Sequence, residues 1–268
     1  MPQRQGKLRV DTATTNMAKW KVIASEISME ASELYSTMVK QVKEVSFAEH
    51  DQITSLYLKY YAGSSAQQVE ADLANKSEII LLFHDQQIVG FTTLEIYSNQ
   101  WQGQTIQVAF SGDTIIHRNH WGRQNLTFAC ISRMGWYKRQ RPEQPMYWFL
   151  IVKGHRTYKY MPVFVKSFYP HWDYESAPLK ALAESLALEK FGKVYNPQTG
   201  ILEFPVSQGH LKQAYAYPNN RELNKPSVQY FLQRNPGYTR GHELVCLCEL
   251  STDNLKPLTR RLFEKDSL

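Results

Sequence analysis

The amino-acid sequence predicts an α+β fold, in which β-strands and amphipathic helices share one core. Residues 106–116 form a continuous run rich in β-branched and aromatic side chains, which is typical of a buried strand. From Leu126 to Tyr137 the apolar side chains recur at helical spacing, so a helix follows this strand after a short polar loop. The chain has 268 residues, 43% of them hydrophobic, enough for one large domain or a domain with an appendage.

The residues before this strand predict two helices and a hairpin. Ser46 and Glu49 have the spacing of a capping box, and a second cap at Ser65 begins a helix that ends near Asn75. Residues 78–83 read as a strand, 85–87 as a turn and 88–97 as the return strand. Residues 1–15 have the composition of a loose tail.

The residues after the helix predicted from Leu126 predict further strands and helices. Proline residues at 142–145 end that helix, and we expect a strand at 146–152, a helix at 178–191 and a strand at 243–250. We therefore divide the chain into a flexible tail (1–16), a core with an N-terminal helical extension (17–172) and a C-terminal extension packed on the core (173–268), together one compact unit.

Positive charge is concentrated in one segment. The formal net charge is +6, and residues 118–141 contain six cations and no carboxylate: Arg118, Arg123, Arg133, Lys138, Arg139 and Arg141. Such a segment predicts an acidic partner. Nucleic acid is the less favoured partner, because the cations occupy several helix faces and the sequence has no base-reading motif.

Several kinds of site and location are disfavoured by composition. No apolar run approaches 18 residues, so we expect no membrane span, and the polar N-terminal residues lack a secretory signal. The three cysteines form no disulfide framework, which favours a reducing cytoplasm. The His and Cys residues lack metal-ligand spacing, so we expect no metal.

The junction between the central strand and the basic helix predicts an anion site. The polar loop brings Gly122 and Arg123 to the start of the helix. Unpaired N–H groups and the helix dipole there both attract negative charge. Gly112, inside the strand, indicates a bulge or a close backbone approach.

The order helix, helix, hairpin, long strand, loop, helix, strand, helix resembles the Gcn5-related N-acetyltransferase (GNAT) superfamily. Residues 88–91 (Ile-Val-Gly-Phe) are similar to its third strand, and residues 115–122 to the strand end and turn before its pyrophosphate loop. The resemblance covers about residues 38–170. It implies a central mixed sheet flanked by helices, in which strands 106–116 and 146–152 diverge and leave a V-shaped slot.

The resemblance also implies an acyl donor, either acyl-CoA or an acyl-phosphopantetheine on an acidic acyl carrier protein. The three signature positions of the family's loop fall on Trp121, Gln124 and Leu126, and all three depart from its Arg/Gln and Gly/Ala pattern. Larger side chains hold a pyrophosphate away from the backbone. Together with the basic segment, this favours a chain longer than acetyl and leaves delivery by a carrier protein open beside acyl-CoA. The implied donor contacts are Ile115, Ile116, His117, Gly122, Arg123, Gln124, Asn125, Leu126, Thr127, His155 and Arg156.

Catalysis in this family needs a route for the amine proton and for the leaving thiolate. The family's acidic tyrosine falls on Phe164, so Tyr158 is a candidate replacement, unless it is a packing residue. Glu95 is a candidate general base or a solvated glutamate. Asp113 either recognises the amine or pairs with an arginine. The resemblance thus implies transfer to a primary amine on a small molecule or peptide. The alternatives are an inactive fold that binds a ligand or partner and a nucleic-acid-binding protein.

Overall fold

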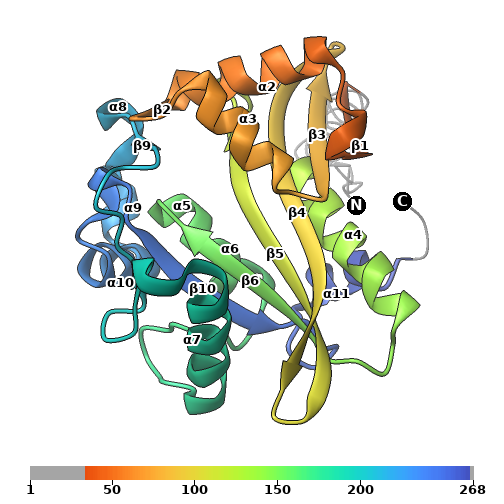
Figure 1. Ribbon diagram of the computed structural model, residues 1–268, viewed down its shortest axis with the longest axis vertical. Helices are drawn as coiled ribbons and strands as arrows, with labels where there is room; N and C mark the ends of the chain where they lie inside the picture. Colours follow the sequence, from red (N-terminus) through yellow and green to blue (C-terminus); the bar gives the residue numbers. More distant parts are fainter. Residues whose placement is uncertain (1–33, 266–268) are drawn as a thin grey trace, which may run out of the picture.

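The computed structural model describes residues 34–265, and its centre is one mixed sheet of eight strands (Figure 1). The predicted tail at 1–16 lies outside the described residues. In spatial order the strands are β1 (Tyr35–Gln41), β3 (Glu78–His84), β4 (Gln87–Trp101), β5 (Gln104–Ile116), β6 (Met146–Val152), β10 (Glu243–Glu249), β8 (Ile201–Leu202) and β7 (Tyr195–Asn196). The pair β5–β6 is parallel and its neighbours are antiparallel. The predicted mixed sheet is confirmed.

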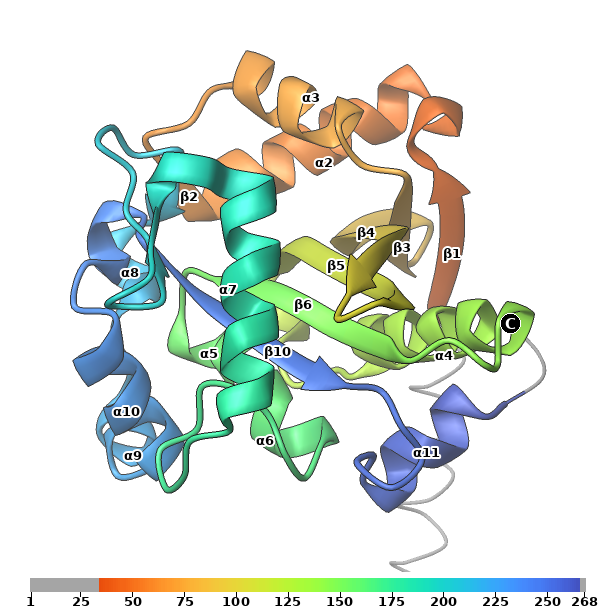
Figure 2. The same ribbon diagram turned by 60° about the horizontal axis from the view of Figure 1, so that its bottom comes forward.

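Helices cover both faces of the sheet. On one face, α2 (Phe47–Tyr60) and α3 (Ala66–Ala74) cover β3–β5, while α7 (Ala177–Phe191) covers β5, β6 and β10 (Figure 2). The other face packs against α4 (Asn125–Gln140), α5 (His155–Tyr158), α6 (Tyr160–Phe164), α10 (Pro226–Arg234) and α11 (Pro257–Phe263). Strand side chains alternate between these cores as the pleat requires.

The remaining elements are short. Strands β2 (Tyr61–Ala62) and β9 (His210–Leu211) pair with each other. The others are η1 (Val42–Glu44), η2 (Arg118–His120), η3 (Gly192–Val194), α8 (Gln213–Ala216), α9 (Asn220–Leu223) and η4 (Tyr238–Arg240). None of the helices in the described residues is long and apolar enough to cross a membrane.

Local sequence signals explain the first elements. Ser46 Oγ accepts a hydrogen bond from the Glu49 N–H (3.3 Å), and the Glu49 carboxylate accepts one from the Ser46 N–H (2.8 Å), which confirms the predicted capping box. Asp85 and Gln86 both have positive φ (49° and 63°), as the tight turn of a hairpin requires. The predicted hairpin of β3 and β4 is therefore confirmed.

The central strands diverge, as predicted. Strands β5 and β6 pair from Gln107 with Met146 to Ser111 with Leu150, and their pairing ends there. At the same point β5 contains a bulge, because Gly112 pairs with Thr93 and Ile115 with Phe91. The residue with positive φ in this bulge is Asp113 (46°), not Gly112. The bulge bends β5 away from β6 and opens the slot.

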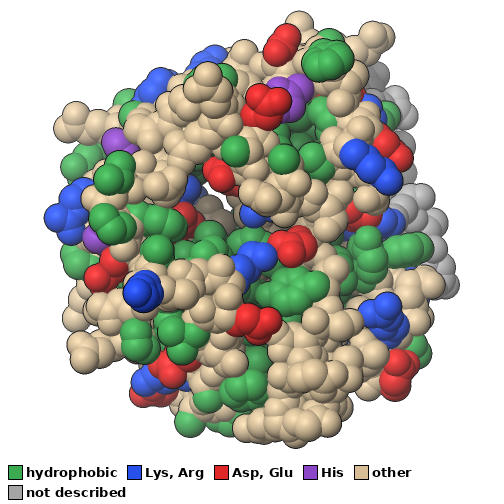
Figure 3. Space-filling model, in the orientation of Figure 1, with side chains coloured by type: hydrophobic (Ala, Val, Ile, Leu, Met, Phe, Trp, Pro, Cys, Tyr) green, Lys and Arg blue, Asp and Glu red, His purple; other side chains and the backbone are tan. Residues whose placement is uncertain are grey.

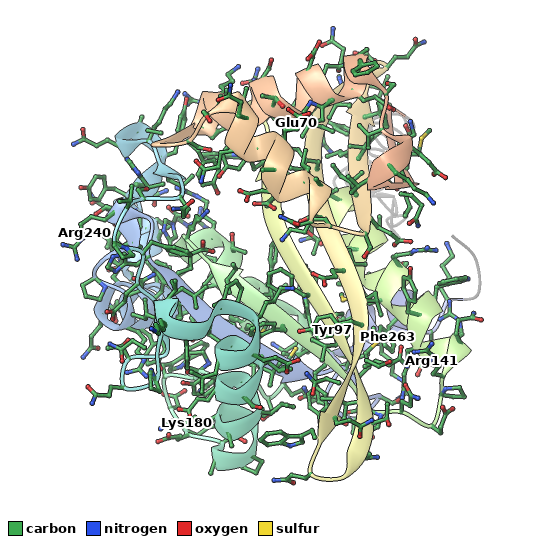
Figure 4. All side chains as sticks on the ribbon, in the orientation of Figure 1. Glu70, Tyr97, Arg141, Lys180, Arg240 and Phe263 are labelled. Atoms are coloured by element: carbon green, nitrogen blue, oxygen red, sulfur yellow. The ribbon has the colours of Figure 1, made fainter. Side chains whose placement is uncertain are left out.

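The basic residues of 118–141 do not form the free positive strip expected from the sequence. Arg133 forms a bidentate ion pair with the buried carboxylate of Glu78 on β3. Other cations bind oxygens near the C-terminal end of α4. Arg139 donates to the carbonyls of Phe263 and Lys265, Lys138 donates to that of Pro142, and Arg141 donates to the hydroxyl of Ser98. Figure 4 labels Arg141 and Phe263 in this part of the molecule. Four of the six cations are thus bound within the fold, and an acidic carrier as the partner of this segment stays a prediction.

Candidate active site

A cavity of about 500 Å³ lies where the end of β5 meets the start of α4, and we call it the loop pocket. Predicted donor contacts that line it are Ile115, Ile116, Gly122, Arg123, Gln124, Thr127 and Arg156. Leu126 is fully buried in the core instead, and its side chain does not reach the pocket. Asn125 does not line the pocket either, so seven of the eleven predicted donor contacts come together at this cavity.

The N-terminus of α4 is open toward an anion. Its N-cap, Gln124, forms no side-chain cap hydrogen bond, and the first turn holds no acidic residue. The N–H groups of the first helical turn have no partner within the helix. The Arg123 N–H, however, donates to the His120 carbonyl (3.2 Å) and is not part of this set. The N–H groups that are available to an anion therefore start at the first residues of α4.

Two predicted histidine contacts lie outside the loop pocket. His117 Nε2 is 2.8 Å from Lys59 Nζ, and its Nδ1 accepts the Asn119 N–H (3.4 Å). Burial, followed by the charge of Lys59, lowers the pKa of His117. His155 is buried, and burial, followed by the charge of Arg156, lowers its pKa to about 4. Neither side chain lines the loop pocket.

The C-terminal residues form a roof over the loop pocket. Leu211, Tyr215 and Glu222 line it from this side. Glu222 binds Lys159 (3.1 Å) and Arg156 (3.4 Å). Burial would raise the pKa of Glu222, but the Asn219 N–H and these two cations lower it to about 2. The sequence pattern does not specify which of the C-terminal residues form this roof.

A second cavity, of about 420 Å³, lies on the opposite face of the slot, and we call it the charged pocket. It lies between the helices α2 and α3 on one side and α7 on the other, and Figure 3 shows this face hollowed there, with charged side chains around the hollow. Tyr61, Thr114 and Thr157 line both cavities. The two pockets therefore meet at the slot between β5 and β6.

The charged pocket contains carboxylates and amines. Lys153 Nζ lies 3.3 Å from Glu243 Oε1, and both side chains are largely buried. Asp113 accepts a hydrogen bond from the Thr93 hydroxyl (3.3 Å). The side-chain partner of Asp113 in the described residues is therefore a threonine and not an arginine. Burial raises the pKa of Glu243 and also that of Tyr61, whose hydroxyl therefore stays protonated at neutral pH.

Two of the three predicted catalytic residues lie away from the slot. Glu95 pairs with Lys190 (2.8 Å) and lines neither pocket. Tyr158 is fully buried, donates to the Pro170 carbonyl (2.7 Å) and also lines neither pocket, so its position is that of a packing residue. Asp113 does line the charged pocket.

Sequence reasoning missed Tyr61, Asp72, Lys153 and Glu243, which all line the charged pocket. One signal was available: Lys153 follows the predicted strand 146–152, and Glu243 begins the predicted strand 243–250. Antiparallel pairing of these strands brings the two ends together, but the pattern did not show that they are neighbours. Within residues 34–265, no group of three His, Cys, Asp or Glu side chains could hold a metal ion.

The sheet order and the splayed central pair are those expected from the sequence resemblance. The fold is GNAT-like. No family model matches the chain, and no curated protein does. Similar solved structures include a probable N-acyltransferase of unknown function from Enterococcus faecalis V583 (11% identity, 50% of this chain, 33% of that chain, TM-score 0.37). Another is a GCN5-related N-acetyltransferase from Kribbella flavida (10% identity, 51% of this chain, 35% of that chain, TM-score 0.37). A third is a GNAT family N-acetyltransferase from Escherichia coli in complex with CoA (11% identity, 48% of this chain, 68% of that chain, TM-score 0.35).

The chain spans about a third of the length of the first two of these proteins. Identities and TM-scores of this size assign no activity to it.

Proposed function

We propose that this protein is an N-acyltransferase that moves an acyl group from a phosphopantetheine thioester to a primary amine. The observation that supports it is the meeting of the two pockets at Tyr61, Thr114 and Thr157. A donor in the loop pocket and an amine in the charged pocket can reach each other through the slot. Holding two reactants in contact in this way is a large part of such catalysis.

The donor's phosphate would bind at the start of α4. There the open helix N-terminus and Arg123, which lines the loop pocket, offer N–H groups and positive charge. Along β5, pairing with β6 ends at Ser111, so the edge of residues 112–116 that faces β6 has no strand partner. Backbone N–H groups on this edge can bind the thioester carbonyl and the oxyanion formed from it.

The reaction would proceed by direct attack. The amine nitrogen bonds to the thioester carbon and transfers a proton to the Asp113 carboxylate. The carbon–sulfur bond then breaks, and the thiolate takes the proton of the Tyr61 hydroxyl. Tyr61 suits this role because its side chain borders both pockets.

The acyl chain would be longer than acetyl, because the roof and wall of the loop pocket carry the apolar side chains of Val163, Phe164 and Leu211. Delivery by a carrier protein has less support than the sequence suggested, since Arg133 and Arg139 are bound within the fold. The donor class we propose is therefore acyl-CoA, with acyl carrier protein as the competitor to be tested.

The test measures donor binding and transfer separately. Native mass spectrometry with acetyl-CoA, octanoyl-CoA and octanoyl carrier protein should show bound octanoyl-CoA, and a panel of primary amines should then be acylated. Tyr61→Phe should bind donor normally and lose about 10²-fold or more in rate, while the exposed Tyr217→Phe serves as the matched control. Donor binding without transfer to any amine would favour the inactive alternative, which the altered loop positions Trp121 and Gln124 also suggest.

A further inference from the structure

The charged pocket contains groups that the fold leaves uncompensated. Its charged side chains are Asp72, Lys76, Asp113, Lys153, Lys190 and Glu243. Lys153 and Glu243 pair with each other, and Lys190 pairs with Glu95 outside the pocket. Two carboxylates and one amine, those of Asp72, Asp113 and Lys76, therefore remain for a ligand.

The two carboxylates come from different elements and converge. Asp72 lies on α3 and Asp113 on the bulge of β5. Burial, followed by repulsion from Asp113, raises the pKa of Asp72, as expected for two negative groups close together. A bound ammonium group would relieve this repulsion. Asp113 directly precedes Thr114, which borders the slot, so the ammonium would lie at the reaction point.

The amines form a second subsite beside it. Lys76 Nζ lies 4.7 Å from the ring centroid of Phe110, and Lys190 Nζ lies 4.6 Å from the same centroid. Among the described residues Lys76 has no hydrogen bond or ion pair, and its ammonium group is 4.0 Å from the point where a Cβ on Gly112 would stand. An ammonium group without a carboxylate partner is suited to an anionic group of a ligand, so Lys76 is the candidate for this subsite.

We infer that the ligand of the charged pocket is a zwitterion of amino-acid size with an apolar side chain. Its ammonium group lies between Asp72 and Asp113, its carboxylate at Lys76, and its side chain against Phe191 and Phe204, which also line the cavity of about 420 Å³. This rests on the proposed function for the reaction itself. The α-ammonium group gives one proton to the Asp72 carboxylate, and the neutral nitrogen then bonds to the thioester carbon and gives a second proton to Asp113. The carbon–sulfur bond of the donor breaks, and the thiolate takes the Tyr61 proton. The product is an N-acyl amino acid.

Calorimetry without donor tests the inference with L-phenylalanine, phenethylamine and 3-phenylpropionate. L-Phenylalanine should bind at least about tenfold more tightly than either compound that lacks one charge. Lys76→Gln should weaken L-phenylalanine about tenfold and leave phenethylamine unchanged, whereas Asp72→Asn should weaken both amines. Lys43→Gln, at an exposed lysine outside both pockets, is the matched control and should change nothing.

The outcomes separate the two proposals. If phenethylamine binds as tightly as L-phenylalanine, or if none of the three compounds binds, the inference is wrong, even where amines are acylated. If L-phenylalanine binds with the expected preference but no donor acylates it, the acyltransferase proposal fails and the zwitterion site stands.

Discussion

Replacing Arg133 with methionine is expected to destabilise the protein strongly without weakening donor binding. The Glu78 carboxylate is 1% exposed and accepts hydrogen bonds from Arg133, Tyr137 (2.9 Å) and Gln41 (2.9 Å). Arg133→Met leaves this buried charge with two neutral donors. Removing one partner of a buried ion pair costs about 3–5 kcal/mol of unfolding free energy.

The corresponding shift in melting temperature can be worked out from chain length. A domain of 268 residues has an unfolding entropy of about 0.6 kcal/mol/K, so the loss corresponds to about 5–9 °C. Circular dichroism melting measures this shift, and the same samples can be tested for donor binding at low and high salt. The double variant Glu78→Leu with Arg133→Met should recover most of the loss, because it leaves no unpaired buried charge.

A different result would refute the structural role of Arg133. If Arg133→Met lost less than about 1 kcal/mol and bound donor more weakly, with a reduced salt dependence, Arg133 would be a donor contact on a free basic surface. This result would support the role expected from the sequence, in which the basic segment attracts an acidic donor.

Three further predictions concern the slot and the roof. Gly112→Leu should fold and bind donor but lose about 10²-fold in transfer rate by filling the slot, whereas Gly112→Ala should stay active, since its Cβ meets Thr93 Oγ1 at an ordinary 3.5 Å. Asp113→Gly should keep its stability or gain up to about 1 kcal/mol, because φ is +46° there, yet lower kcat and raise the KM for the amine, because the proposed proton acceptor is lost. The pKa of Glu222 is lowered to about 2, so its contribution to stability is present above its ordinary pKa of 4.5 and is lost as pH falls toward 2. His155, with a pKa lowered to about 4, adds to the loss below pH 6.5. Urea midpoints measured from pH 7 to pH 3 should fall, and fall less below pH 4.5 in Glu222→Gln.

Elements with local signals could be predicted from the sequence, and contacts between distant segments could not. The capping box at Ser46, the hairpin turn at Asp85 and the buried run of β5 each depend on a few adjacent residues. The ion pair of Glu78 with Arg133 joins β3 to α4, and no periodicity indicates it. The basic segment therefore seemed uncompensated, although its carboxylate partner was present elsewhere in the chain.

The same reasoning explains the outcome at the candidate site. The loop pocket was found because its residues are nearly consecutive, from Ile115 to Thr127. The charged pocket was missed apart from Asp113, because it is assembled from α2, α3, β5, β6, α7 and β10. A hydrophobic pattern predicts where strands begin and end, but it does not specify which strands become neighbours.

The pairing of β6 has a consequence for how the chain is made. Beyond Leu150, β6 has no partner in β5 and pairs with β10 alone, up to Val152 with Leu244. The ribosome delivers β6 long before β10, and domains fold as their residues emerge. During that interval an apolar strand edge is unprotected and can pair with another chain. A translation product that stops short of β10 would keep this edge and aggregate, so we expect chaperones to be needed during synthesis until the last strand arrives.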